Sequence, residues 1–357
     1  MFNEKEKKEV RKEKMNGKNL AHWEVKEKDF PKAGTIEKEL TFLLRYALLA
    51  PSGHNTQPWN FSIRGNKISV YVDLARNLPV VDHDNREMYI SAGCALANLL
   101  IAAEHFHFGY KLDFFPEGKE DELVAVAEFF AEELEQSEFP ENLFASITQR
   151  HTNRNEYETR TINEESLQKL KECADEEGIR LDLIKEPQVK SEVAELIARG
   201  DVIQMNNKAF RRELASWIRH NWTKSGDGMP CYAFGIPGAI SFLGPFFIKS
   251  FNMSKSQSEK DRRFADQTPV LGILSSAKDD KLSCVKTGIL FEKIALTATK
   301  IGIQYAFLNQ PIEVPELRQE LKSLLKLEEL PQLLFRLGYA KLRRHTPRRP
   351  IQEVLVQ

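Results

Sequence analysis

Two long helical segments of similar construction most constrain what this chain can fold into. Residues 86–107 and 283–300 are rich in Ala and Leu, and each segment is ended by a glycine and followed by a strand-like run. Gly93 opens the first apolar run and Gly288 opens the second, which indicates a weak internal repeat. Elsewhere helices and short strands alternate without regular βαβ units, so the sequence predicts an α+β fold with a mixed sheet packed by helices.

The remaining elements follow from hydrophobic periodicity and from Gly and Pro positions. A hairpin is expected over 59–72, around Gly65-Asn66, and a long loop or lid over 226–245. Other helices are expected at 36–49, 143–149, 164–176, 189–199, 201–217 and 315–325, and other strands at 110–115, 123–130, 269–275, 303–308 and 332–339. Trp217 and Trp222 are expected to anchor the core or the lid.

Composition excludes several classes of protein. The chain has 357 residues, of which 41% are hydrophobic and 29% charged, and its net charge is −1. Such a balance predicts a folded protein without a global field for nucleic acid or for an anionic membrane. The charged run 1–14 is not a signal peptide and is expected to be a solvated helix or a frayed tail. The longest apolar stretch, 233–248, is too short and too broken by Gly and Pro to span a membrane.

Cysteine usage points to a reducing compartment. The four Cys are far apart and no CxxC pair occurs, so neither a metal site nor a dithiol motif is expected. We therefore expect a cytoplasmic protein.

The segment Pro51-Ser52-Gly53-His54-Asn55-Thr56-Gln57-Pro58-Trp59 carries the most chemical information. A row of short donors and acceptors follows a helix stop, and amide side chains suit the mixed polar edge of a heteroaromatic ring. The same residues also make an ordinary hydrogen-bonded turn. His54 fits either a ligand contact or a bond within its own loop.

Two further segments are basic. Arg150 and Arg154 lie four residues apart, so a helix would place both on one face, with Thr152 able to reach a phosphate oxygen. A solvated basic helix start is the competing interpretation. The run 343–350, Arg-Arg-His-Thr-Pro-Arg-Arg-Pro, follows a strand and precedes apolar residues, which favours a docked segment over a free basic tail.

Together these three segments resemble the nitroreductase family, especially its single-chain Acg-like branch. The 51–59 run is similar to the signature of that branch, Arg150-His151-Thr152-Asn153-Arg154 to the family's Arg-x-Ser/Thr-x-Arg element, and the ending to its closing Pro-Arg-Arg-Pro motif. The resemblance implies a nitroreductase-like fold whose two halves, supplied elsewhere by two identical subunits, are joined here in one chain. It further implies a charged extension at 1–34, a first half at 35–138 that carries the ring-side loop, and a second half at 139–357 that carries the phosphate clamp and the lid.

The resemblance implies one bound FMN, because each motif occurs once. The residues expected to bind it are Pro51, Ser52, His54, Asn55, Gln57, Arg150, Thr152, Arg154, Arg344, Arg348 and Arg349. No catalytic side chain is expected, since the flavin carries the chemistry.

The implied activity is two-electron transfer from NAD(P)H to a small-molecule acceptor such as a nitroaromatic or a quinone. Because both halves of the site are in one chain, a monomer can suffice. Two alternatives stay open: an FMN-binding or storage protein whose lid restricts turnover, and a flavin-free protein that kept the fold. Asp227, in the lid, fits either a substrate contact or a turn.

Overall fold

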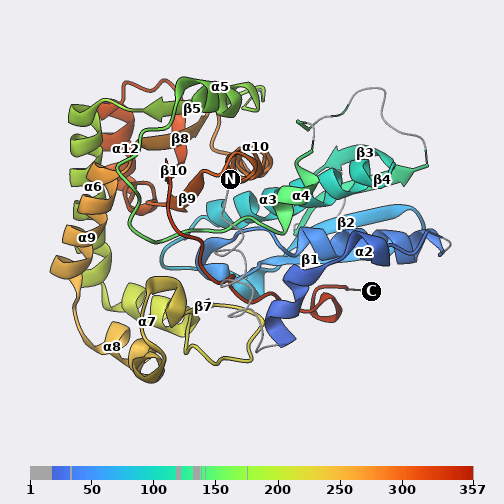
Figure 1. The fold of residues 1–357 in the computed structure, drawn as a ribbon, viewed down its shortest axis with the longest axis horizontal. Coiled ribbons are helices and arrows are strands. Elements are labelled where there is room, and N and C mark those ends of the chain that lie inside the picture. The colour runs from blue at the N-terminus through green and yellow to red at the C-terminus, as the bar shows by residue number, and fades with distance from the viewer. Residues whose placement is uncertain are drawn as a thin grey trace.

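The computed structural model describes residues 18–356, except for positions 33, 118–121, 132–136, 138, 141 and 175. Two four-stranded sheets lie apart, the first at the right and the second at the upper left of Figure 1, with two long helices between them. The architecture is the expected α+β arrangement of two tandem halves. Within the described residues, no helix combines the length and the apolar character needed to cross a membrane.

The first half contains one antiparallel sheet with the strand order β1-β2-β4-β3. The hairpin is confirmed: Ile63 pairs with Ile68, and Gly65 takes a φ of 59° in the turn. The elements of this half are α2 (Ile36–Ala47), β1 (Trp59–Arg64), β2 (Lys67–Val72), α3 (Arg86–His105), β3 (Gly109–Phe114) and β4 (Leu123–Phe130).

The second half repeats this plan with the strand order β5-β8-β10-β9 and adds more helices. Its sheet and the helix that packs between the halves comprise β5 (Ile179–Ile184), β8 (Val270–Ser276), α10 (Lys281–Lys300), β9 (Gln304–Phe307) and β10 (Leu330–Gly338). The other helices are α4 (Phe144–Ile147), α5 (Glu164–Glu172), α6 (Pro187–Asn206), α7 (Lys208–Trp217), α8 (Gly244–Ser250), α9 (Ser254–Gln267), α11 (Gln310–Glu313) and α12 (Pro315–Leu324).

The two glycines of the internal repeat face each other where α3 crosses α10. A Cβ on Gly93 would lie 2.1 Å from the carbonyl oxygen of Val285, and one on Gly288 would lie 2.0 Å from that of Ile90. Only glycine permits so close an approach of two backbones. Both helices are buried along most of their length, so this crossing forms the centre of the molecule.

Each sheet also pairs, at one of its edge strands, with a segment outside its four strands. Leu355 forms a parallel bridge to Phe61 of β1, and Thr152 forms a parallel bridge to Tyr305 of β9. Both sheets are antiparallel within their four strands, so each of them gains its parallel pairing at an edge strand. The C-terminal segment 341–356 therefore returns to the first half, and residues 150–154 lie along the second.

Several expected boundaries differ from the structure. Gly200 does not separate two helices, since α6 continues through it. The glycine leaves room for Gln310: a Cβ added at position 200 would lie 2.7 Å from the Cβ of Gln310. The expected loop 226–245 is structured, with β7 (Met229–Pro230) and two 3-10 helices, η5 (Cys231–Phe234) and η6 (Gly238–Leu243). β5 and α9 were not expected, although Ile179, Leu181 and Leu183 alternate with Arg180 and Asp182 along β5; the sequence of α9 is mostly polar.

The N-terminal extension is more ordered than expected where it is described. Run 1–14 lies outside the described residues, but the 3-10 helix η1 (Lys18–Glu24) packs on the fold and buries Leu20 and Trp23.

Candidate functional site

The ring-side loop is held in an unusual backbone conformation. His54, Asn55 and Gln57 have φ values of 49°, 57° and 52°, in the left-handed region that non-glycine residues rarely adopt. The amide of Asn55 donates to the carbonyl oxygens of Gly228 (2.8 Å) and Pro347 (3.1 Å). The loop is therefore a hydrogen-bonded turn, and its bonds reach both the lid and the C-terminal segment.

His54 and Gln57 of this loop do not line the cavity that Pro51, Ser52 and Asn55 border. The Gln57 amide donates to the Gly226 carbonyl (2.8 Å) and accepts from the backbone N–H of Arg349 (2.8 Å). His54 does not line the cavity either, and burial, assisted by Arg154, lowers its pKa to about 4, so the ring is neutral at pH 7. Pro51, Ser52 and Asn55 do line the cavity.

Residues 150–154 are extended and not helical, which corrects the expected helical face. The N–H of Asn153 donates to the carbonyl of Tyr305 (2.8 Å), so pairing with the edge of β9 fixes the extended form. Alternation along an extended chain still puts Arg150, Thr152 and Arg154 on one side, and all three line the cavity.

Arg150 is bonded within the protein. Only 2% of it is exposed, its Nε lies 3.2 Å from a carboxylate oxygen of Glu292, and its Nη2 donates to the carbonyl of Leu49 (2.6 Å). Its Nη1 donates to the hydroxyl of Tyr305. Burial raises the pKa of Glu292 to about 7, against the attraction of Arg150. Arg150 therefore fixes the end of the ring-side loop as well as lining the cavity.

Arg348 has a similar role from the C-terminal side. Its Nη2 donates to the carbonyls of Leu49 and Ala50, both at 3.1 Å, and its Nη1 donates to the Asn55 side-chain oxygen (2.9 Å). Burial and then the nearby Arg150 lower its pKa to about 9. The basic run 343–350 is thus a docked segment, and the free-tail alternative is wrong.

Arg349 lies outside the cavity, in contrast to the expectation that it completes a clamp there. Its guanidinium donates to the carbonyls of Gln57 (3.0 Å) and Glu353 (2.8 Å). Arg348 lines the cavity, whereas these bonds hold the Arg349 guanidinium away from it. Asp227 also lies elsewhere: it pairs with Arg76 and with Arg219, which favours the turn interpretation.

Trp23 is the cavity residue that the sequence did not indicate. Its ring stacks on His345 at 3.9 Å between centroids, and His345 stacks on His151 at 3.8 Å. The indole N–H donates to the carbonyl of Thr346 (2.9 Å), and the Arg348 guanidinium lies 4.6 Å from the ring. The only local signal was a lone tryptophan in an otherwise charged extension.

The cavity lies where the two halves and the N- and C-terminal segments meet. Its volume is about 40 Å³, far below the roughly 300–1,000 Å³ of a typical ligand pocket. Among the residues described, its lining includes no Asp or Glu, and its cationic members are Arg150, Arg154, Arg343, Arg344 and Arg348. Such a lining favours an anion.

Arg154 and Arg344 are the cations best able to meet that anion. Neither forms an ion pair among the described residues; Arg154 contacts the sulfur of Met229 (3.7 Å), and the Arg344 guanidinium lies 5.0 Å from the Tyr232 ring. The buried Nε of Arg344 has no hydrogen-bond partner in the described part of the chain. The donor set therefore matches a phosphate, and Pro51, Met229 and Ala233 form an apolar wall beside it; at about 40 Å³ the cavity admits a flat ring only if its lining moves apart.

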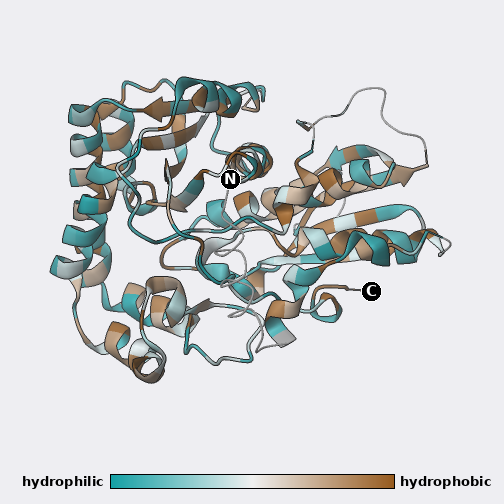
Figure 2. Cartoon of the chain, in the orientation of Figure 1, coloured by the Kyte–Doolittle hydropathy of each residue, from teal (hydrophilic) through white to brown (hydrophobic). Residues whose placement is uncertain are grey.

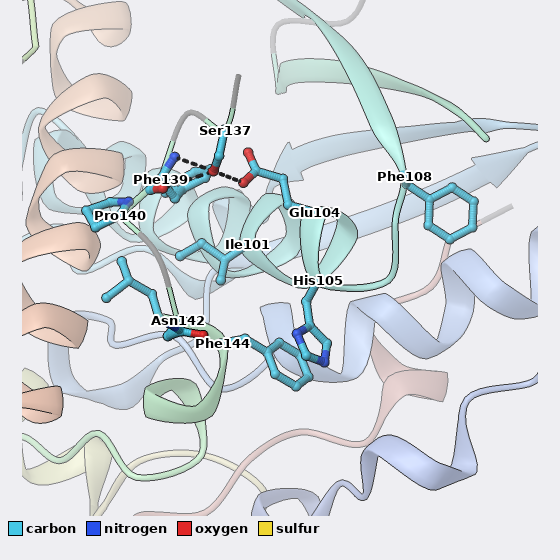
Figure 3. Close-up of a pocket in the computed structure, with 10 residues that line it drawn as sticks. Ile101, Glu104, His105, Phe108, Ser137, Phe139, Pro140, Asn142 and Phe144 are labelled. Atoms are coloured by element: carbon cyan, nitrogen blue, oxygen red, sulfur yellow. Dashed lines mark hydrogen bonds between the residues drawn. The ribbon is translucent and has the colours of Figure 1, made fainter. Parts of the chain in front are cut away.

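A second cavity, of about 240 Å³, lies at the C-terminal end of α3 (Figure 3). His105 stacks on Phe144 at 3.6 Å, and Glu104 accepts hydrogen bonds from Ser137 and Tyr110. It contains none of the residues singled out from the sequence. The described residues contain no group of three or more His, Cys, Asp or Glu side chains placed to hold a metal ion.

The fold and site thus define an α+β protein of two joined halves with a cationic cavity between them. No family model matches the sequence. The chain is 24% identical over 338 residues to "Putative NAD(P)H nitroreductase Rv3131" of Mycobacterium tuberculosis, which covers 91% of this chain and 92% of that protein. It is 22% identical over 315 residues to "Putative NAD(P)H nitroreductase acg" of the same organism, covering 87% and 93%.

A solved structure, a nitroreductase with bound FMN from Bacteroides fragilis, is similar with a TM-score of 0.37 and 18% identity, covering 58% of this chain and 95% of that one. The similarity to the curated relatives extends along almost the whole chain. The chain is therefore similar, over most of its length, to proteins named putative NAD(P)H nitroreductases, acg among them.

Proposed function

We propose that this protein binds one FMN per chain and acts as an NAD(P)H-dependent oxidoreductase on a small, flat electrophile such as a nitroaromatic or a quinone. The observation that carries the proposal is the carboxylate-free cationic cavity beside the strained loop 51–55. The curated relatives, which are named putative NAD(P)H nitroreductases, supply the reaction class.

In this proposal the phosphate is held by Arg154 and Arg344, with the Thr152 hydroxyl as a further donor. Forked guanidinium donors match the geometry of phosphate oxygens, and no carboxylate of the lining competes for them. Pro51, Ser52 and Asn55 lie on the ring side. Arg150 and Arg348 position the loop by donating hydrogen bonds to the carbonyl of Leu49. Their positive charge would also stabilise negative charge on a ligand in the cavity.

FMN held by these residues would supply two-electron redox chemistry between NAD(P)H and the acceptor. The protein would then bind and orient the flavin and the substrate and exclude water from them. No side chain is needed as an acid or base. The ring-side loop belongs to the proposed first half (35–138) and the phosphate residues to the second (139–357), so a monomer suffices.

The alternative is an FMN-binding protein with little turnover. Its support is the narrow cavity, which is closed on one side by Trp23 and His345 and on another by Met229 and Ala233 of the lid. In this alternative the same residues would bind FMN but would block the access of NAD(P)H to the flavin ring.

One experiment tests both. The flavin carried by the protein as purified is released and identified by chromatography, and the protein, then saturated with FMN, is mixed anaerobically with NADPH or NADH. We expect about one FMN per chain and bleaching of the flavin absorbance by at least one donor. FMN without bleaching by either donor selects the storage protein, and FAD or no flavin at all refutes the proposal.

A further inference from the structure

A group of exposed apolar side chains covers the outer face of the lid region. We call it the aromatic patch, and its members are Trp222, Ile240, Phe242, Leu243, Phe246, Phe247, Phe251 and Met253, each between 40% and 60% exposed. Among the described residues, every exposed Phe or Trp belongs to it. Trp222, expected as a core or lid anchor, is 58% exposed.

The patch is presented by an ordered part of the fold. The rings contact one another, with Trp222 5.4 Å from Phe242 and Phe247 5.5 Å from Phe251. On its inner side, Gly244 approaches the Cys231 sulfur so closely that an added Cβ would lie 2.6 Å away. The exposed rings are therefore held outward by packing underneath them, and an apolar patch of this size marks an interaction surface.

Its position makes it accessible. In Figure 1 α7 and α8 form the lower left rim of the molecule, away from both sheets, and Figure 2 shows hydrophobic residues along this rim.

The charge around the patch selects the partner. Residues 228–258 contain no Asp or Glu, although the whole chain has 52 acidic residues in 357, and the stretch carries Lys249 and Lys255, both exposed. Asp227, just before it, is neutralised by Arg76 and Arg219. The surface is thus apolar and aromatic, with exposed lysines within it and the first acidic residue, Glu259, only beyond it, which is the composition of an interfacial membrane-binding element.

A second copy of this chain fits the charge less well. A symmetric contact places the same patch on both sides, so the lysines of the two copies would face each other. An anionic lipid surface instead pairs them with phosphate groups while the rings enter the interfacial region.

We propose that the aromatic patch docks on an anionic lipid surface, with the rings of Phe246, Phe247 and Trp222 inserted at the headgroup level and Lys249 and Lys255 against lipid phosphates. The docked protein lies on the membrane without spanning it. Met229 and Ala233 of the same lid region line the cationic cavity, so docking would place that cavity close to the lipid surface.

The test is co-sedimentation of the full chain with vesicles of phosphatidylcholine and phosphatidylglycerol, compared with vesicles of phosphatidylcholine alone. We expect binding to the anionic vesicles that weakens with added salt. The double variant Lys249→Gln/Lys255→Gln should bind roughly twentyfold more weakly, since each lysine near an anionic surface contributes roughly fivefold. Phe246→Ser/Phe247→Ser should lose binding, and Leu282→Ser, an exposed apolar residue at the start of α10, should keep it.

The proposal is overturned if the protein binds neither kind of vesicle. It is also overturned if Phe246→Ser/Phe247→Ser binds the anionic vesicles as well as the native chain does. Concentration-dependent dimerisation that the phenylalanine variant abolishes, without vesicle binding, assigns the patch to a second copy instead. Thermal unfolding of each variant shows that the fold is retained. Flavin content is measured on the same samples, so a protein without FMN that still binds vesicles contradicts the proposed function and not the docking.

Discussion

Trp23 stacks on His345 with the two rings 3.9 Å apart and 17° from parallel. The pair joins opposite ends of the chain, and it closes the cationic cavity on the side of the terminal segments. A segment that would otherwise count as a charged extension thus contributes an aromatic wall to the candidate site. The backbone N–H of Arg348 also donates to the carbonyl of Asn19 (3.0 Å), so the two termini are joined at more than one point.

Trp23→Ala should speed FMN uptake by the flavin-free protein, because removing the indole widens a cavity of only about 40 Å³. Stopped-flow quenching of FMN fluorescence measures the rate. Trp222→Ala, which removes an indole that does not line the cavity, is the control and should leave the rate unchanged. Slower uptake with weaker binding in Trp23→Ala would instead mean that the indole forms part of the flavin-binding surface.

Arg150 and Arg344 should differ in what their loss affects. Arg150→Ala leaves the buried Glu292 carboxyl without its ionic partner and removes one of the two guanidinium donors to the Leu49 carbonyl, so the free energy of unfolding should fall by about 3–5 kcal/mol. Arg344→Ala removes no ion pair among the described residues and should leave stability unchanged. If Arg344 meets the phosphate, its loss should weaken FMN binding about ten- to hundredfold, since a hydrogen bond to a charged group contributes about 1.5–3 kcal/mol.

Chemical denaturation and FMN titration on both variants separate the two effects. Arg64→Ala, exposed in the hairpin, is the control for general charge and should change neither quantity. Equal losses of FMN affinity in all three variants would show that only overall charge matters.

Stability should fall as pH rises through neutrality. Burial raises the pKa of Glu87 to about 8 and that of Glu313 to about 7, both from an ordinary 4.5, and the two carboxyl groups lie in contact beside Asn309. The folded protein therefore holds these protons more tightly than the unfolded chain does. The stabilisation is complete below pH 4.5 and is lost as pH rises through about 7 to 8.

Thermal unfolding across this range measures the effect. Glu313→Gln, which cannot ionise, should flatten the fall between about pH 4.5 and 7 relative to the native chain. Glu316→Gln, exposed on α12, should leave the profile unchanged. A Glu313→Gln profile as steep as that of the native chain would rule out this pair as its source.

Gly93→Ala and Gly288→Ala should each destabilise the protein by at least about 1–3 kcal/mol, because the added methyl groups meet backbone oxygens at the crossing of α3 and α10. Gly53→Ala is a matched comparison, since its nearest neighbours are the ends of the flexible Glu87 and Leu78 side chains, at 3.2 Å. Its cost should be smaller in chemical denaturation. Tolerance of alanine at both crossing positions would mean that the helices can separate without loss.

The sequence by itself determined the features that depend on neighbouring residues. Gly65 and the alternating residues around it specify the hairpin 59–72, because turn geometry and side-chain alternation are local properties. The apolar runs opened by Gly93 and Gly288 identified the two central helices and their repeat. The docking of 343–350 was also correctly expected, from the apolar residues that follow the basic run.

Only the tertiary structure decided which groups meet across long separations. The four-residue spacing of Arg150 and Arg154 would place both on one face of a helix. Hydrogen bonding to β9 instead holds this segment in an extended conformation. Gly200 looks like a helix end, yet contact with Gln310 explains it within a continuous helix. Trp23, finally, reaches the cavity only because the chain's two ends are brought together. Each of these outcomes depends on contacts between residues far apart in the chain. A local sequence pattern carries no information on the energy of such contacts.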